Sequence, residues 1–160
     1  MKTLILDKNN YNEKEKNLIL EAFLEFSYIR IKETNNKDLW KKVIIEKFNN
    51  YMKKNLDNLK IIYIKNDHNE VIGFLFWLKK TEEVIYFENK DYLYINYLYI
   101  KEKEQWKWLS SKLKDLIINE ARKMWLKELR LHVADNNKKA QSIYKKWWFD
   151  DYYHLLKKEL

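Results

Sequence analysis

The sequence predicts an α/β fold, with a mixed central β-sheet flanked by helices in the order β-α-α-β-β-β-α-β-α-β. Two features of the 160 residues carry this prediction. Runs of β-branched and aromatic residues, typical of strands, alternate with segments whose apolar residues recur every three or four positions, as in amphipathic helices. No linker, repeat or low-complexity tail interrupts the pattern, and the length suits one hydrophobic core. We therefore expect a single domain over residues 1–160.

The first half of the chain predicts a strand, two helices and a hairpin. The strand is expected over residues 2–7 and the first helix over residues 13–32, where Asn12 and Glu15 have the spacing of a capping box. A second helix follows a break rich in Asn and Asp and runs to about residue 54. The hairpin strands are expected over residues 60–65 and 70–80, with the turn at residues 66–69.

The second half predicts a strand, a helix, a strand and a helix. The tyrosine-rich residues 92–100 read as a strand, and residues 109–124 carry apolar side chains at helical spacing. Apolar residues alternate over 129–133, and Asn137 is placed to cap a further helix. Residues 149–156 predict a last strand or hairpin.

Composition excludes several functional classes. The chain has a formal net charge of +8, but its lysines are spread among glutamates and form no basic arm for nucleic acid. Without cysteine it has no disulfide, thiolate metal site or cysteine nucleophile, and its three histidines lack metal-ligand spacing. The longest apolar run, residues 71–78, is too short to span a bilayer, and residues 1–7 lack a signal-peptide pattern. We expect a cytoplasmic protein with no metal ion and no membrane partner.

Two separated segments carry motifs of defined spacing. Residues 98–113 read LYIKEKEQWKWLSSKL, and residues 133–149 read VADNNKKAQSIYKKWWF. They resemble two motifs of the GNAT superfamily of N-acyltransferases. In that family a strand is followed by a cradle with Gln or Arg and spaced glycines, and a later segment carries spaced Asn, Ala, Tyr and Gly-Phe. The residues standing at these positions are Gln105, Trp108 and Ser110 in the first motif, and Asn137, Ala140, Tyr144, Trp148 and Phe149 in the second.

The resemblance implies an N-acetyltransferase that moves an acetyl group from acetyl-CoA directly to a primary amine in a ternary complex. It places the pantetheine arm of the cofactor beside Leu98 and Ile100, with the Leu98 N–H polarising the thioester carbonyl. Asn137 would help to hold this arm, and Tyr144 would protonate the departing thiolate. The diphosphate would bind the backbone amides of a cradle at a helix N-terminus, which comprises Gln105, Trp106, Lys107, Trp108, Leu109, Ser110 and Ser111.

Several parts of this interpretation stay open. Tyr144 also reads as an ordinary core tyrosine and Asn137 as an ordinary helix cap. Many relatives carry a carboxylate base at positions that Tyr94 and Asn96 occupy, which leaves a water chain, an acid such as Glu88 or Asp91, or an amine that arrives neutral. The acceptor, a small-molecule or peptide amine, would be selected by the two N-terminal helices and residues 81–91, and the protein is a monomer or a homodimer.

Tryptophan occupies positions where the family pattern or the backbone requires glycine. The chain has seven tryptophans, one glycine and no proline. Trp106 and Trp108 stand in the cradle, Trp148 stands in the second motif, and Trp125 follows a helix that should end in a left-handed residue. Trp77 is a candidate fifth position. We hypothesise that a glycine codon of the source organism was read as tryptophan, because UGA means stop, tryptophan or glycine in different genetic codes.

Three other interpretations compete with this one. A decayed or engineered sequence would also carry misplaced tryptophans. If the tryptophans are genuine and fill the diphosphate site, the protein is a catalytically inactive GNAT-like binding module. A basic nucleic-acid-binding domain would use lysines and a stacking platform of Tyr92, Tyr94, Tyr97 and Tyr99, although sheet packing also accounts for these rings.

Overall fold

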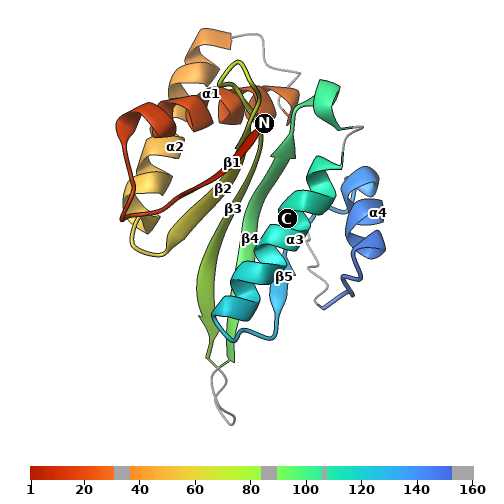
Figure 1. The fold of residues 1–160 in the computed structure, drawn as a ribbon. Helices are drawn as coiled ribbons and strands as arrows, with labels where there is room; N and C mark the ends of the chain where they lie inside the picture. Colours follow the sequence, from red (N-terminus) through yellow and green to blue (C-terminus); the bar gives the residue numbers. More distant parts are fainter. Residues whose placement is uncertain (31–36, 84–89, 106–107, 153–160) are drawn as a thin grey trace, which may run out of the picture.

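The computed structural model describes residues 1–30, 37–83, 90–105 and 108–152, and its strands form one mixed sheet (Figure 1). The strand order is β1-β2-β3-β4-β5, with antiparallel pairs except for the parallel pair β4 and β5. The predicted hairpin is confirmed, and Asn66 Oδ1 stabilises its turn by accepting the N–H groups of His68 and Glu70. The strands are β1 (Lys2–Leu6), β2 (Leu59–Lys65), β3 (Val71–Glu82), β4 (Lys90–Ile100) and β5 (Leu129–Leu131).

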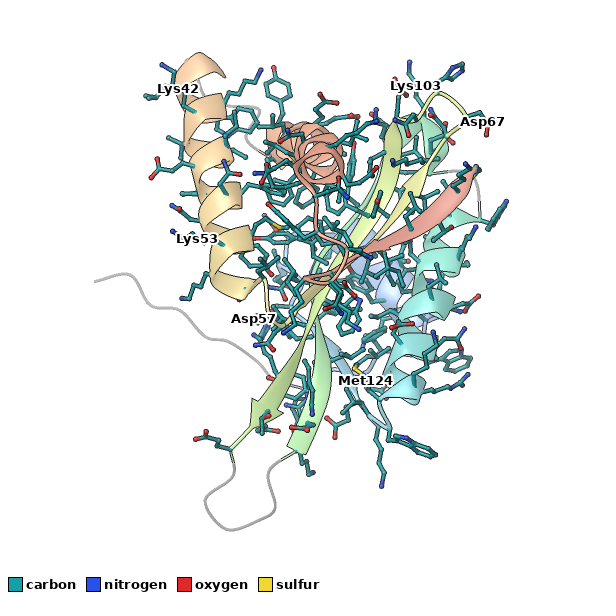
Figure 2. The ribbon with its side chains drawn as sticks, turned by 60° about the vertical axis from the view of Figure 1, so that its left-hand side comes forward. Lys42, Lys53, Asp57, Asp67, Lys103 and Met124 are labelled. Carbon is teal, nitrogen blue, oxygen red and sulfur yellow. The ribbon has the colours of Figure 1, made fainter. Side chains whose placement is uncertain are left out.

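Helices cover both faces of this sheet, as the predicted fold requires (Figure 1). In the described residues, no helix has the length and apolar character needed to cross a membrane. Lysines of α2 such as Lys42 and Lys53 point away from the sheet (Figure 2). The helices are α1 (Glu13–Arg30), α2 (Lys37–Asn55), α3 (Leu109–Lys123) and α4 (Lys138–Lys146), with a short 3₁₀ turn at Glu102–Glu104.

The prediction was less accurate near the C-terminus. The strand expected over residues 129–133 ends at Leu131, because only three of its residues pair with β4. Residues 149–152 form no regular element, and the rest of the last expected strand lies outside the described residues.

The sheet separates two hydrophobic clusters. The first lies against α1 and α2 and is rich in phenylalanine, including Phe23, Phe48 and Phe76. The second lies against α3 and contains Trp77, whose side chain is only 1% exposed. The backbone of Trp77 is not left-handed, so the structure gives no support to glycine at this position.

A β-bulge in β4 changes which side chains face each cluster. Phe76 pairs with Tyr97, but the next residue of β3, Trp77, pairs with Ile95, so Asn96 is an extra residue on β4. An extra residue reverses the alternation of side chains along the strand. Leu93 and Ile95 before the bulge, and Leu98 and Ile100 after it, therefore all face α3, while Tyr94, Tyr97 and Tyr99 share the opposite face.

The same bulge marks the point where β5 leaves β4. β5 pairs with β4 only at Leu93, Tyr94 and Ile95. Within the described residues, no strand lies beside residues 96–100 on that side. The second half of β4 therefore has an open edge.

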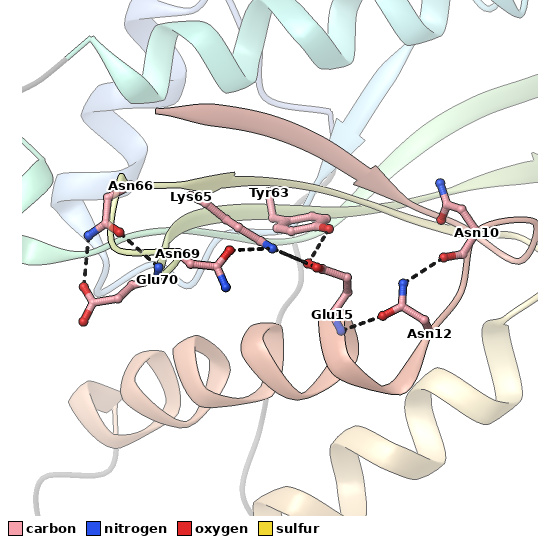
Figure 3. A network of polar contacts seen from close by, with 8 residues as sticks. All are labelled: Asn10, Asn12, Glu15, Tyr63, Lys65, Asn66, Asn69 and Glu70. Atoms are coloured by element: carbon pink, nitrogen blue, oxygen red, sulfur yellow. Dashed lines mark hydrogen bonds and ion pairs between the residues drawn. The ribbon is translucent and has the colours of Figure 1, made fainter.

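The N-terminus of α1 is attached to the sheet by a largely buried ion pair (Figure 3). Asn12 Oδ1 caps the helix by accepting the Glu15 N–H at 2.9 Å, as predicted. Glu15 does not complete the capping box, because its carboxylate instead accepts from Lys65 Nζ at 2.8 Å and from the Tyr63 hydroxyl at 2.7 Å. Lys65 is only 6% exposed, so the pair fixes α1 against β2.

Two helices end in the same glycine-type turn, and tryptophan takes the left-handed position in each. Trp125 after α3 has φ 57°, and Trp148 after α4 has φ 66°. The next N–H bonds back across each turn, from Leu126 to the Ala121 carbonyl and from Phe149 to the Tyr144 carbonyl, the pattern of a Schellman motif. The expected left-handed end of α3 is confirmed. Both tryptophan side chains are more than nine-tenths exposed, at 91% and 92%, so ring packing does not offset the strain.

The ion pair predicts a specific loss of stability in acid. Burial raises the pKa of Glu15, but the hydrogen bonds from Lys65 and Tyr63 outweigh burial and hold that pKa below its ordinary value. Its stabilisation is therefore fully present above the unfolded-state pKa of about 4.3 and is lost as pH falls through the folded-state value. We expect Glu15→Gln to lower the free energy of unfolding by about 3 kcal/mol at pH 7, with a smaller difference from wild type at pH 3.

Urea unfolding at both pH values measures this difference. Glu21→Gln, which removes an exposed carboxylate from the same helix, is the control. An equal loss at pH 7 from both substitutions would contradict the role assigned to Glu15.

The left-handed tryptophans predict stabilisation by glycine. Because a left-handed backbone costs a side chain about 1 kcal/mol or more, Trp125→Gly and Trp148→Gly should each raise the free energy of unfolding by about 1 kcal/mol. Trp125→Ala keeps the Cβ atom and should gain much less. Trp77→Ala should instead destabilise by about 3–5 kcal/mol through the cavity it leaves. Urea unfolding ranks the four variants, and a loss of stability in either glycine variant would refute the strain argument.

Candidate active site

A cavity of about 240 Å³ lies between the open edge of β4, the N-terminus of α3 and the helix α4. Figure 1 shows α3 and α4 on the side of β4 where β5 lies. The cavity brings together residues from both sequence motifs, between which nineteen residues of the chain lie. The predicted site residues that line it are Leu98, Ile100, Gln105, Ser110, Asn137 and Tyr144.

The N-terminus of α3 presents backbone donors that no hydrogen bond of the helix uses. The first helical hydrogen bond runs from the Lys112 N–H to the Trp108 carbonyl, so the N–H groups of Leu109, Ser110 and Ser111 have no acceptor within the helix. The helix dipole adds an attraction for anions at this end. Amides from consecutive residues can each donate to an oxygen of one diphosphate, so this donor set suits that group.

Tryptophan stands at the start of this donor set. Trp108 is the N-cap of α3, its side chain makes no capping hydrogen bond, and it is 60% exposed, with Lys112 Nζ 4.8 Å from the ring centroid. Its φ of −60° is ordinary, so the backbone alone does not demand glycine here. The objection to tryptophan is steric, because a bulky ring beside the amides occupies space that a diphosphate needs. Trp106 and Lys107 lie outside the described residues.

Gln105 connects three parts of the site. Its Nε2 donates to the Ile100 carbonyl at the end of β4 at 3.1 Å, and its Oε1 accepts from Lys139 Nζ of α4 at 2.6 Å. The sequence predicted a role in cofactor binding, and the structure shows a side chain that positions α4 against the end of β4.

Asn137 and Tyr144 hold α4 and face the cavity. Asn137 Oδ1 accepts the Ala140 N–H at 3.2 Å, which is the helix cap predicted from the sequence. Tyr144 packs against Trp147 and Phe149 with ring centroids 5.8 and 5.9 Å apart. Burial raises the pKa of the Tyr144 hydroxyl, so it keeps its proton at neutral pH.

A second cavity, of about 290 Å³, lies on the opposite face of β4 under α1 and α2. Its wall is mostly aromatic, and no acidic side chain is among the described residues that line it. The Tyr51 hydroxyl on this wall is buried without a hydrogen-bond partner in the described part of the chain. Tyr97 lines this cavity and Leu98 lines the first one, so consecutive residues of β4 connect the two.

The residues considered as a general base have different positions. Asp91 is paired with Lys79 at 2.5 Å and accepts from the Thr81 hydroxyl at 2.7 Å, and Glu88 lies outside the described residues. Asn96 is the bulged residue, and its Oδ1 is buried without a partner within the described ranges. The part of the chain described contains no group of three or more acidic, histidine or cysteine residues that could hold a metal ion.

Sequence reasoning missed one polar contact on the face of β4 opposite α3. The Tyr94 hydroxyl and His132 Nδ1 are hydrogen-bonded at 2.5 Å across the parallel pair β4 and β5. The two residues are 38 positions apart in the chain, and only the register of Tyr94 with Arg130 brings them together. The one available signal was the alternation of side chains along β5. Arg130 and His132 are two positions apart, so alternation places them on the same face.

Solved structures share this fold. A protein from Pyrococcus furiosus described as an acetyl transferase is 17% identical, covers 99% of this chain and 100% of its own, and has a TM-score of 0.77. An acetyltransferase from Clostridium acetobutylicum, solved with acetyl-CoA, is 19% identical over 99% of this chain and 95% of its own, with a TM-score of 0.69. An aminoglycoside acetyltransferase from a soil metagenome, in complex with sisomicin, is 15% identical over 99% and 95%, with a TM-score of 0.65. At these identities the similarity establishes the fold alone.

The family itself follows from the sequence profile of the acetyltransferase (GNAT) family, which matches residues 21–148. The chain therefore belongs to the GNAT family, and it is an acyltransferase of the N-acetyltransferase type. No curated protein sequence is significantly similar to this chain.

Proposed function

We propose that the protein transfers an acetyl group from acetyl-CoA to a primary amine by direct attack in a ternary complex. The observation that carries the proposal is the first cavity, because the open edge of β4, Ser110 in the first turn of α3 and Tyr144 all border it. An acyl donor with an extended amide-bearing arm and a diphosphate requires these features. Family membership supports the same reaction class.

Residues of the chain divide the work of this reaction. When bound, acetyl-CoA supplies an activated acyl group as a thioester. The amides of Leu109, Ser110 and Ser111 bind the diphosphate, and residues 96–100 bind the arm as an added strand would. The Leu98 N–H polarises the thioester carbonyl, because this residue lies at the open edge and lines the cavity.

Tyr144 donates the proton that the departing thiolate needs. Its hydroxyl stays protonated at neutral pH because burial raises its pKa, and it lines the cavity beside Leu98. A phenol within reach of a thiolate is an effective general acid.

This role predicts the effect of Tyr144→Phe. The substitution removes one hydroxyl and keeps the ring that packs on Trp147 and Phe149, so folding should be preserved. We expect kcat to fall by about 100-fold with little change in the KM for acetyl-CoA. Tyr152→Phe, at an exposed tyrosine, is the control. Unchanged kcat would show that Tyr144 is only a packing residue.

The acceptor is proposed to enter by the second cavity. Its wall is aromatic, and the described residues that line it include Lys47 but no acidic side chain. A polycation would therefore meet a like charge there without a described counter-charge, which favours an amine on an apolar skeleton. The amine then approaches β4 from the face of Tyr97 while the thioester lies on the face of Leu98. The two reactants meet at the open edge, where no strand of the described structure separates them.

The binding of coenzyme A tests the proposal and the glycine hypothesis together. The chain as written should show a small rise in melting temperature with coenzyme A, because a tryptophan at the N-cap of α3 takes up space that the diphosphate needs beside the donors. A variant with glycine at 106, 108, 125 and 148 should show a rise of several degrees at saturating ligand, as binding to the folded state alone stabilises it. A variant with glycine at 125 and 148 only is the control for backbone strain.

The outcomes separate the remaining interpretations. If neither the written chain nor the glycine variant responds to coenzyme A, the acetyl-CoA site is wrong. The codons for 106, 108, 125 and 148 decide the origin of the tryptophans, and UGG at all four would exclude recoding. A nucleic-acid-binding function gains nothing from the structure, because Tyr92, Tyr94, Tyr97 and Tyr99 are at least half-buried and form no open stacking platform.

A further inference from the structure

The hydrogen bond between Tyr94 and His132 lies on the face of β4 from which the acceptor is proposed to approach. Tyr94 shares this face with Tyr97, which lines the acceptor cavity, because the bulge at Asn96 places both on one side of the strand. The Tyr51 and Tyr97 hydroxyls belong to the same group, since the nearby Tyr97 and Tyr94 hydroxyls raise the pKa of Tyr51 after the larger effect of burial. The hydrogen-bonded pair therefore lies on the same face of β4 as the cavity-lining Tyr97, three positions before it in the chain, although neither Tyr94 nor His132 lines the cavity itself.

The transfer reaction needs a group that accepts a proton from the amine. An amine is protonated at neutral pH and must lose a proton before or during its attack on a thioester. Asp91 is neutralised by Lys79 on the same edge, and no acidic side chain is among the described residues lining the acceptor cavity. Tyr94 alone does not accept the proton at neutral pH, because burial, followed by the effects of Tyr92 and Tyr97, raises its pKa and keeps its hydroxyl protonated.

We propose that Tyr94 and His132 form the proton-accepting relay of the transfer reaction, with Tyr94 in contact with the amine and His132 acting through it. This inference rests on the proposed function. It requires neutral His132 with the hydrogen on Nε2, so that Nδ1 accepts the Tyr94 O–H. An imidazole is suited to this role because it takes up and releases a proton near neutral pH.

The proton balance of the step is complete within these groups. The amine N–H proton moves to Tyr94 Oη as the Tyr94 O–H proton moves to His132 Nδ1. The amine becomes neutral, Tyr94 is again a phenol, and His132 becomes an imidazolium. Because the His132 side chain is exposed, it returns the proton to solvent directly. The neutral amine nitrogen then attacks the thioester carbonyl and the C–S bond breaks. Tyr144 protonates the departing thiolate, and the second N–H proton, released as the amide forms, restores the Tyr144 hydroxyl by way of solvent.

A positive charge beside the pair favours loss of the proton from the bound amine. Lys80 Nζ of β3 lies 3.8 Å from the centroid of the Tyr94 ring. The cation keeps this face unfavourable for a second positive charge and so favours the neutral amine. The other titratable groups on the elements packed around the pair are Tyr51 of α2, Tyr92 and Tyr97 of β4, and Arg130 of β5 with its partners Glu82 and Glu128.

Kinetics of matched variants test the relay. The probe reaction is the acetylation of 2-phenylethylamine by acetyl-CoA, or the hydrolysis of acetyl-CoA if this amine is not accepted. A thiol reagent measures the coenzyme A that either reaction releases. The chain has no cysteine, so the reagent reports released coenzyme A without background from the protein. His132→Gln keeps an acceptor for the Tyr94 O–H but cannot take the proton. We expect it to lower kcat by about 100-fold with KM unchanged, and to remove the dependence of kcat on pH that the relay predicts for wild type.

Controls separate the relay from a structural role. Tyr94→Phe should cause a similar loss, and the double variant should lose no more than either single one, as members of one unit do. Tyr92→Phe, on the same face but packed against Arg130, should retain wild-type kcat and pH profile. An unchanged kcat in His132→Gln with normal coenzyme A release by wild type would overturn the relay alone. Absence of coenzyme A binding and release in every form would overturn the proposed function and the relay with it.

A measurement without turnover provides a second test. In ¹⁵N-labelled protein, the His132 ring should be the Nε2–H tautomer, and Tyr94→Phe should shift the Nδ1 resonance toward that of an unbonded nitrogen. A ring protonated on Nδ1 at neutral pH would donate to Tyr94 and would overturn the proposal.

Discussion

The single extra residue at Asn96 sets the geometry on which the rest of the site depends. The bulge falls where β5 separates from β4, so the second half of β4 keeps its pairing with β3 and leaves its other edge open. An open edge in the middle of a sheet exposes backbone donors and acceptors that must find partners. Here the open edge borders a cavity between α3 and α4, where an extended ligand can supply those partners.

The bulge also connects the two hydrophobic clusters to the two cavities. Without the extra residue, Tyr97 would face α3 and Leu98 would face α1 and α2, and a one-residue shift of this kind moves every side chain to the opposite face. With it, Tyr97 and Tyr99 of β4 join the phenylalanine cluster and Tyr97 lines the cavity under α1 and α2, while aliphatic residues pack on α3. Packing and site geometry are therefore consequences of the same backbone irregularity.

Local signals predicted most of the elements, and contacts distant in the sequence account for what was missed. The hairpin, the caps at Asn12 and Asn137 and the left-handed end of α3 depend on neighbouring residues, so the sequence contains them. The Glu15 side chain departed from its local motif because Lys65, fifty positions away, offers a stronger buried partner. The bulge at Asn96 and the contact of Tyr94 with His132 depend on strand register, which alternation alone does not fix.

Exposure provides a physical criterion for deciding which tryptophans the fold requires. A tryptophan retained for stability buries its large apolar surface, as Trp77 does at 1% exposed. Trp108, Trp125 and Trp148 are 60%, 91% and 92% exposed, and the last two also occupy left-handed backbone. At the two helix ends tryptophan therefore adds strain without the compensation of burial, while the turns keep every hydrogen bond of the motif. The fold accordingly tolerates these rings, although its backbone at both turns suits a residue without a Cβ atom. Because the turn at residue 148 ends α4, which lines the cavity, the residue at this position affects the stability of that wall.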